Sequence, residues 1–153
     1  MPLRASLQQP AAIDALIARL DRLGPEQQRQ WGAMTAHQML CHLSDSFLVG
    51  LGERYASAVD TWWSRNVIRW IALRSPAPWP KDIPTRPEID QQRGGTRPDL
   101  FARDRARVVE LMRRFAQPDA RFGRHPIFGP MRRDDWMAWG YRHVDHHLRQ
   151  FGL

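Results

Sequence analysis

The sequence predicts an all-α fold, specifically an antiparallel four-helix bundle with long irregular connections. Three observations support this class. Apolar residues recur at steps of three and four in four long stretches, which is the period of an amphipathic helix. No stretch of note has the two-residue period of a half-buried strand. Proline-rich segments separate the helical stretches, and since 153 residues without internal repeats suit one core, we expect a single domain over residues 1–153.

Turn and capping residues mark the first two predicted helices. The first begins near Pro10, because proline suits the first turn of a helix, and Gly24-Pro25 ends it. Thr35 opens the second as the first half of a capping box that Gln38 completes, and this helix continues to about Gly52. The inward positions are apolar: Ile13, Leu16, Ile17, Leu20 and Leu23 in the first, and Met39, Leu40, Leu43, Phe47 and Leu51 in the second.

Two more long helices complete the predicted bundle, beside a shorter one. Residues 62–73 form the shorter helix, and the six prolines of residues 75–98 exclude regular structure after it. The third long helix is predicted over residues 98–116 and the fourth over residues 132–151, with another irregular connection between them. The inward positions of the third helix are Phe101, Val108, Val109, Met112 and Phe115.

The composition is basic but does not indicate nucleic-acid binding. The formal charge of +7 comes from 22 arginines and one lysine. The arginines are interspersed with acidic residues, as in RDRARVVELMRR, and the chain has no basic run and no recognition motif. We therefore expect a small-molecule substrate and consider a nucleic-acid partner disfavoured.

A soluble, cytoplasmic protein is expected from the remaining composition. The single cysteine, Cys41, excludes an intrachain disulfide and is typical of a reducing compartment, where we expect a buried, inert thiol. The N-terminal residues lack the apolar core of a signal peptide. The most apolar stretch, 62–73, holds two arginines and is too short to cross a bilayer, so no membrane partner is expected. Its exposed face is a candidate interface for a homodimer.

Histidines are concentrated in the last predicted helix. His143 and His147 lie four residues apart, so both rings project from one face, where two imidazoles can share a metal ion. An ordinary hydrogen-bonded pair is the competing interpretation. The rest of that face is apolar or small: Trp136, Trp139, Gly140 and Phe151. Buried imidazoles need partners, and one cation serves two rings. By spacing alone His143 with His146 fits almost as well. His42 on the second helix is the candidate third ligand, and a core histidine satisfied by ordinary hydrogen bonds is the competing interpretation.

Three segments together resemble the DinB-like (DinB/YfiT-like) superfamily. They are WGAMTAHQMLCHL at 31–43, HPIFGPM at 125–131 and WMAWGYRHVDHHLRQFG at 136–152. They have the order and spacing of an uncharacterised branch that ends in HxDHHLRQFG, and the resemblance spans nearly the whole chain. It implies an up-down-down-up four-helix bundle that holds a divalent metal, usually zinc or nickel.

Carried over position by position, the resemblance also implies a ligand set. The ligand on the second helix falls on His42. The pair on the last helix falls on His143 and His147, because the second histidine directly precedes the segment that ends in Gln150. One departure is visible: residues 132–135 read RRDD where the branch often has a hydroxyl residue and a glutamate, which weakens the predicted cap of the last helix.

The expected function is that of a metal-dependent enzyme. Three neutral histidines leave an open coordination position, as in catalytic rather than structural sites, and such an ion activates a bound water or thiol. The wider superfamily includes thiol-dependent S-transferases and isomerases, so the resemblance implies S-transfer or hydrolysis, with a low-molecular-weight thiol as a cosubstrate. The alternative is a non-catalytic, stress-associated module that contains a metal, with residues 75–98 as a partner surface instead of an active-site lid.

Four neighbours of the ligands are candidates for orienting them or for contacting substrate: Asp45, Asp145, His146 and Gln150. Metal-bound histidines commonly need such partners. For Asp145 a solvated surface acid is the competing interpretation, and for Gln150 a structural contact. Arg142 and Arg149 flank the histidine face and are candidates for attracting an anionic thiol. The sequence leaves the substrate, the choice of metal and the oligomeric state open.

Overall fold

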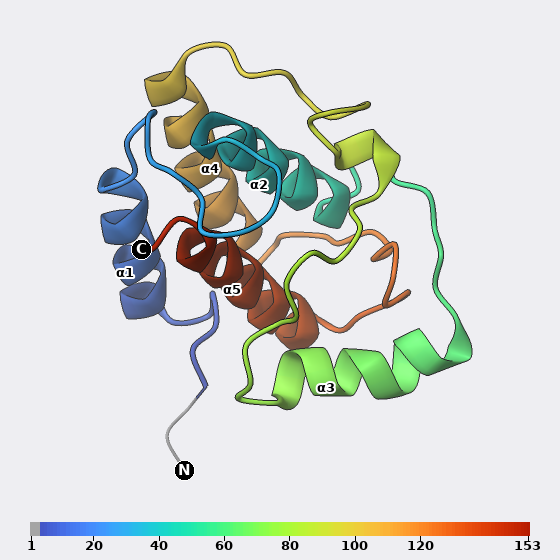
Figure 1. Cartoon of the computed structure of the whole chain (residues 1–153). Helices are drawn as coiled ribbons and strands as arrows, with labels where there is room; N and C mark the ends of the chain where they lie inside the picture. The colour runs from blue at the N-terminus through green and yellow to red at the C-terminus, as the bar shows by residue number, and fades with distance from the viewer. Residues whose placement is uncertain (1–3) are drawn as a thin grey trace.

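The computed structural model describes residues 4–153, and helices joined by irregular connections account for that range (Figure 1). Residues 1–3, at the start of the predicted domain, lie outside the described part. The α-helices of the described residues are α1 Pro10–Asp21, α2 Ala36–Gly50, α3 Arg69–Arg74, α4 Phe101–Phe115 and α5 Arg133–Gln150. The predicted all-α class is therefore confirmed.

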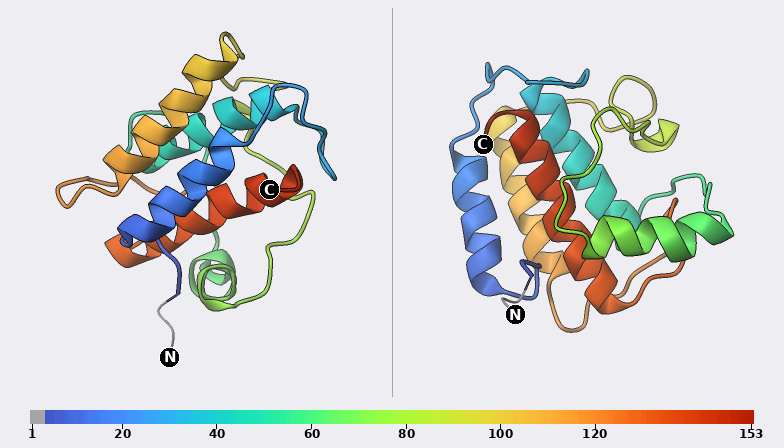
Figure 2. Two further views of the ribbon diagram at one scale, coloured as in Figure 1. Left: turned by 90° about the vertical axis from the view of Figure 1, so that its left-hand side faces the viewer. Right: turned by 60° about the horizontal axis from the view of Figure 1, so that its bottom comes forward.

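Four of these helices form the bundle. Figure 2 shows α1, α2, α4 and α5 side by side, with α1 and α5 running in one direction and α2 and α4 in the other. Contacts at the helix starts agree with these directions. The Leu7 N–H donates to the carbonyl oxygen of Met137 (3.2 Å), which joins the starts of α1 and α5. His37 Nε2 lies 2.7 Å from Asp104 Oδ2, which joins the starts of α2 and α4. The order of directions is thus up, down, down, up.

Aromatic and leucine side chains fill the space between the four helices. The largest buried side chains include Trp136, Phe47, Phe115 and Phe151. Burying a side chain of this size contributes about 1.5–3 kcal/mol to stability. Gly140 allows α5 to approach the chain that precedes α1, since a Cβ there would lie only 2.5 Å from Leu7 Cδ1. The middle of α5 is therefore held tightly, one turn before its first clustered histidine.

The capping box predicted at the start of α2 is confirmed. The Thr35 hydroxyl accepts from the backbone N–H of Gln38 (3.1 Å), and the Gln38 side chain accepts from the backbone N–H of Thr35 (2.9 Å). The predicted start of α4 is wrong by three residues. The chain is still extended at Leu100, and the backbone N–H of Asp99 donates to the carboxylate of Asp104 (3.0 Å) instead of entering a helix.

The start of α5 has no side-chain cap, in agreement with the departure noted at residues 132–135. Arg132 precedes the helix and offers no acceptor. The two acids of the first turn have other partners: Asp134 accepts from Gln8 Nε2 (2.7 Å), and Asp135 forms an ion pair with Arg74 (2.7 Å). Both carboxylates still lie at the positive end of the helix dipole, where negative charge is favourable.

The predicted shorter helix consists of a π-helical stretch, η1 Ser64–Ile68, followed directly by α3. It lies across the bundle and packs against α5 (Figures 1 and 2). The proline-rich connection after it is irregular as predicted, apart from a single 3-10 turn, η2 Pro87–Ile89, that packs on α2. Within residues 4–153, no helix is both long and apolar enough to span a bilayer.

Candidate metal centre

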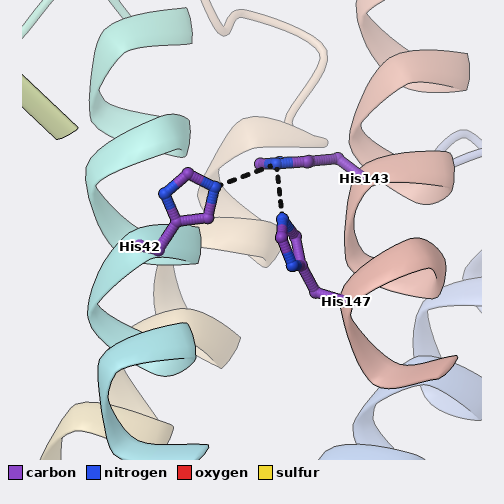
Figure 3. A group of neighbouring side chains, drawn as sticks. All are labelled: His42, His143 and His147. Carbon is purple, nitrogen blue, oxygen red and sulfur yellow. Dashed lines mark hydrogen bonds between the residues drawn. The ribbon is translucent and has the colours of Figure 1, made fainter. Parts of the chain in front are cut away.

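Three buried histidines meet between α2 and α5. His42 projects from α2, and His143 and His147 project from consecutive turns of α5 toward it (Figure 3). The three residues are 4%, 9% and 8% exposed. One ring nitrogen of each lies within 4.8 Å of the other two. The helix face predicted from the spacing therefore points into the bundle, and the structure brings together the three residues that the resemblance singled out.

The outer nitrogens of two rings fix which nitrogen carries the proton. His42 Nδ1 lies 3.0 Å from the backbone carbonyl of Ile89, and a carbonyl only accepts, so Nδ1 is protonated. His147 Nδ1 lies 3.0 Å from Gln150 Oε1. The amide of Gln150 is itself oriented, because its Nε2 donates to the carbonyl oxygen of Trp31 (2.9 Å). A neutral imidazole has one N–H, so both Nε2 atoms present bare lone pairs to the cluster.

His143 stands between these two lone pairs. Its Nε2 lies 3.3 Å from Nε2 of His42 and 3.2 Å from Nε2 of His147 (Figure 3). A single N–H on His143 Nε2 satisfies one lone pair and leaves the other facing a nitrogen. The Nδ1 of His143 is buried and has no hydrogen-bond partner among residues 4–153. Hydrogen bonding within the described residues therefore does not satisfy this cluster, although buried polar groups usually are satisfied.

A divalent cation resolves this arrangement. In a tetrahedral site with metal–nitrogen bonds of about 2.0–2.1 Å, ligand nitrogens are separated by about 3.3 Å. The two nitrogen–nitrogen distances at His143, 3.3 and 3.2 Å, agree with that separation. The donor set of three neutral imidazoles is one that zinc, nickel and copper accept. The residues present thus fit a bound divalent ion.

The protonation states of the three rings favour metal binding. Burial lowers the pKa of His143 and of His147 well below the ordinary value, and the neighbouring histidines lower both further. Burial also lowers the pKa of His42, although the Ile89 carbonyl and the charge of Asp45 oppose the shift. Neutral imidazoles are the form that binds a metal, so the rings need not lose a proton at neutral pH before an ion enters.

Asp45 is buried on α2 close to His42, and its hydrogen-bond partners lie in the proline-rich connection. Its carboxylate accepts from Gln91 Nε2 (2.8 Å) and from Thr96 Oγ1 (2.6 Å), and it forms an ion pair with Arg54 (3.1 Å). These contacts fix residues 91–96 on α2, next to the Ile89 carbonyl that orients His42. Asp45 thus forms its hydrogen bonds with residues 91 and 96, and the group that contacts His42 directly is the backbone carbonyl of Ile89.

The other three predicted neighbours have different surroundings. Gln150 contacts the cluster directly, as described above. Asp145 is partly buried and forms ion pairs with Arg19 of α1 (2.7 Å) and with Arg149 (2.9 Å). The ring of His146 lies 5.2 Å from that of His147, centroid to centroid, and burial lowers its pKa. Sequence reasoning missed the Ile89 carbonyl, because nothing in a proline-rich stretch marks which carbonyl will meet a ring.

A cavity of about 610 Å³ adjoins the cluster. The three histidines and His146 line it, together with side chains of η1, α3 and the connection over residues 75–92. Its volume falls within the range of about 300–1,000 Å³ that is typical of small-molecule sites. The open side of the histidine cluster therefore faces a space that a substrate can enter.

Comparison with known proteins identifies a family but no activity. Residues 3–152 match the model of the family described as "Protein of unknown function (DUF1569)". The match includes both helices that carry the clustered histidines. A search of curated proteins and a search of solved structures gave no match.

Proposed function

The chain belongs to the DUF1569 family, whose description assigns no activity, and from the histidine cluster we propose that it is a metal-dependent enzyme. In this proposal His42, His143 and His147 hold one divalent ion, zinc or nickel, through their Nε2 atoms. Membership of the DinB-like superfamily is part of the same proposal. The observation that supports it is that three Nε2 atoms meet inside the bundle. Two of them, those of His42 and His147, are unprotonated, because the proton of each ring is on Nδ1.

The proposed reaction is S-transfer or hydrolysis. An ion bound by three neutral ligands supplies a Lewis acid with an open position, which lowers the pKa of a coordinated water or thiol. The chain's own residues orient the ligands: Ile89 holds His42 and Gln150 holds His147. The three rings are buried, which limits their contact with bulk water, and the cavity beside them has room for a substrate. Outer partners of this kind fix the ring tautomer and the direction of its lone pair.

Metal analysis of protein purified without a histidine tag tests this proposal. Wild-type protein reconstituted with zinc or nickel and then desalted is expected to retain one ion per chain, and His143→Ala is expected to retain none. His37→Gln, a histidine at the start of α2 outside the cluster, is the matched control and keeps the ion. Retention of less than about a fifth of an equivalent by the wild type would exclude a resident metal.

Turnover assays then separate an enzyme from a binding module. An ester and a thiol–electrophile pair serve as general probes of hydrolysis and of S-transfer. Turnover that a chelator abolishes and that the added ion restores supports the enzyme. Full metal occupancy without turnover of either probe supports instead a non-catalytic module that contains a metal.

A further inference from the structure

The walls of the cavity beside the histidines are mostly apolar. Ile68 from η1, Ile71 from α3 and Ile83 from the proline-rich connection contribute aliphatic side chains. Trp79 covers the side nearest the cluster, with its ring centroid 6.1 Å from that of His143 and 5.9 Å from that of His146. A ligand in this space therefore meets imidazole nitrogens in one place and hydrocarbon over most of its remaining surface.

The aliphatic side chains remain exposed although they line the cavity. Ile68, Ile71 and Ile83 are 50%, 52% and 54% exposed, respectively. Isolated exposed apolar residues are ordinary, but a group of them around one opening marks a binding surface for an apolar partner. Ile68 and Ile71 lie one turn apart on the short helix and Ile83 comes from the proline-rich connection, so two segments bring aliphatic side chains to the same opening, which is therefore apolar.

The charges around the cavity do not suit a polyanionic ligand. Among the described residues, the charged side chains that line it are Asp82, Arg86 and Asp90. The guanidinium of Arg86 is engaged by Ser57 Oγ (2.6 and 3.2 Å). Arg142, a sequence candidate for attracting an anionic thiol, donates instead to the backbone carbonyls of Ser75 and Ala77.

Arg149, the other arginine that the sequence suggested for attracting an anionic thiol, forms an ion pair with Asp145. We propose that the cavity binds an apolar molecule, aliphatic or aromatic, with a single metal-coordinating headgroup. The headgroup meets the ion at the three histidines and the apolar body lies along Trp79, Ile71 and Ile83. This inference rests on the proposed metal site and narrows its substrate class to lipophilic thiols or lipophilic esters, amides and acids.

A series of straight-chain hydroxamic acids tests the apolar body. Acetohydroxamate, butanohydroxamate, hexanohydroxamate and octanohydroxamate share one metal-binding headgroup and differ only in the tail. Titration of the zinc-loaded protein by calorimetry is expected to show affinity rising up to about fourfold per added methylene while the cavity fills. The octano compound should bind at least a hundredfold more tightly than the aceto compound. Affinities within threefold of one another across the series would overturn the proposal.

Variants on the short helix locate the effect. Ile71→Gln and the double change Ile68→Gln/Ile71→Gln alter half-exposed positions, so the fold is expected to survive. Both should reduce the ratio of octano to aceto affinity, the double change by about tenfold or more. Trp70→Gln is the matched control: Trp70 is 65% exposed on the same helix and does not line the cavity. Equal ratios in the Ile71 and Trp70 variants would contradict the proposed path of the tail.

Two further probes distinguish the failure of this inference from the failure of the metal site. If no metal binds but the cavity is apolar, hydroxamates and 1-alkanols of equal length bind alike and both improve with length. If the metal binds but the cavity does not select tails, hydroxamates bind without length dependence. A direct comparison of 1-hexanethiol with glutathione tests the charge argument, since tighter binding of glutathione would overturn the preference for an apolar ligand.

Discussion

Two clusters on α2 have the same outline and different chemistry. In one, His143 and His147, a turn apart on α5, meet His42 from α2. In the other, His37 and Cys41, a turn apart on α2, meet Asp104 from α4. Both offer three ligand atoms within 4.8 Å of one another, so spacing and proximity do not distinguish them.

Hydrogen bonding does distinguish them. In the second cluster one oxygen, Asp104 Oδ2, receives His37 Nε2 (2.7 Å), the backbone N–H of Asp99 (3.0 Å) and the Cys41 thiol (3.7 Å). Burial, with Asp104 adding to it, raises the pKa of Cys41 to about 12, so the thiol remains protonated and donates. Every donor has an acceptor. In the His42–His143–His147 cluster, by contrast, the three Nε2 atoms that face one another carry at least two lone pairs and at most one proton. The difference teaches that a candidate metal site is better recognised by unsatisfied acceptors than by spacing.

The strongest test of this contrast is removal of the central ring. At free zinc a thousandfold above its dissociation constant, binding stabilises the wild type by about 4 kcal/mol. For a chain of this size that corresponds to a rise of about 8–16 °C in the thermal midpoint. His143→Ala should show no such rise, because it removes the ligand nitrogen that lies next to both of the other two. Thermal melts with and without zinc make the measurement, and a zinc-dependent rise retained in the variant would refute the assignment.

Loss of an orienting partner should have a smaller effect. Gln150→Leu removes the acceptor of His147 Nδ1 while keeping a buried side chain of similar size. Zinc affinity is expected to fall by about 10- to 100-fold, as is usual when such a partner is lost. Gln150→Glu keeps the acceptor for His147 Nδ1 but loses the donation from Gln150 Nε2 to the Trp31 carbonyl, so its zinc affinity should lie between those of Gln150→Leu and the wild type. Competition with a chromophoric chelator measures the affinities, and equal losses in both variants would show that the acceptor at His147 Nδ1 does not set the affinity.

His125 is a buried histidine outside the metal-binding cluster, so it shows what burial alone does to an imidazole. Burial lowers its pKa to about 3, and its Nδ1 accepts the backbone N–H groups of Ile127 and Phe128 (both 3.1 Å). The unfolded chain takes up this proton below about pH 6.5, while the folded chain does so only near pH 3. Stability from His125 is therefore complete above pH 6.5 and is lost as the pH falls, by about 1.4 kcal/mol per pH unit.

Urea unfolding between pH 4 and 7 checks this expectation. In His125→Asn, the unfolding free energy should depend less steeply on pH than in the wild type, by about 1.4 kcal/mol per pH unit, since one proton fewer is taken up on unfolding. Zinc should leave that difference unchanged, because His125 is not a ligand. A variant curve parallel to that of the wild type would show that His125 does not titrate between the two states.

The smallest expected effect belongs to the second cluster. Cys41→Ala and His37→Gln should leave one zinc ion per chain and an unchanged zinc affinity, since the cluster around Asp104 is satisfied without a metal. The metal-to-protein ratio of each variant measures its zinc content, and competition with the chromophoric chelator measures its zinc affinity. A second ion in the wild type that disappears in Cys41→Ala would erase the contrast between the clusters.

Much of the fold was predictable from the sequence, because its causes are local. The apolar period of each helix and the capping box at Thr35 involve residues within a few positions of one another. The end of the first helix was less well predicted, because α1 ends at Asp21, three residues before Gly24-Pro25. The start of α4 was mispredicted because the Asp104 carboxylate binds the backbone at Asp99, which delays the helix until Phe101.

The cluster was predictable only in part. The spacing of His143 and His147 placed both on one inward face, His42 on the second helix was the candidate third ligand, and the resemblance singled out these three histidines. The groups that orient the rings were harder to predict. Asp45 and Asp145 were the natural candidates by proximity in sequence, yet their carboxylates are occupied by partners from other segments, among them Thr96 and Arg19. The carbonyl that orients His42 comes from a connection whose path depends on tertiary contacts.

X-ray absorption spectroscopy of the zinc-loaded, tag-free protein tests the central claim most directly. The zinc edge reports the identity and number of atoms bound to the ion. We predict one zinc per chain with three imidazole nitrogens at about 2.0–2.1 Å and no sulfur neighbour, and loss of this signal in His143→Ala. A sulfur shell at about 2.3 Å would assign the ion to Cys41, and the absence of any bound zinc would remove the proposed centre altogether.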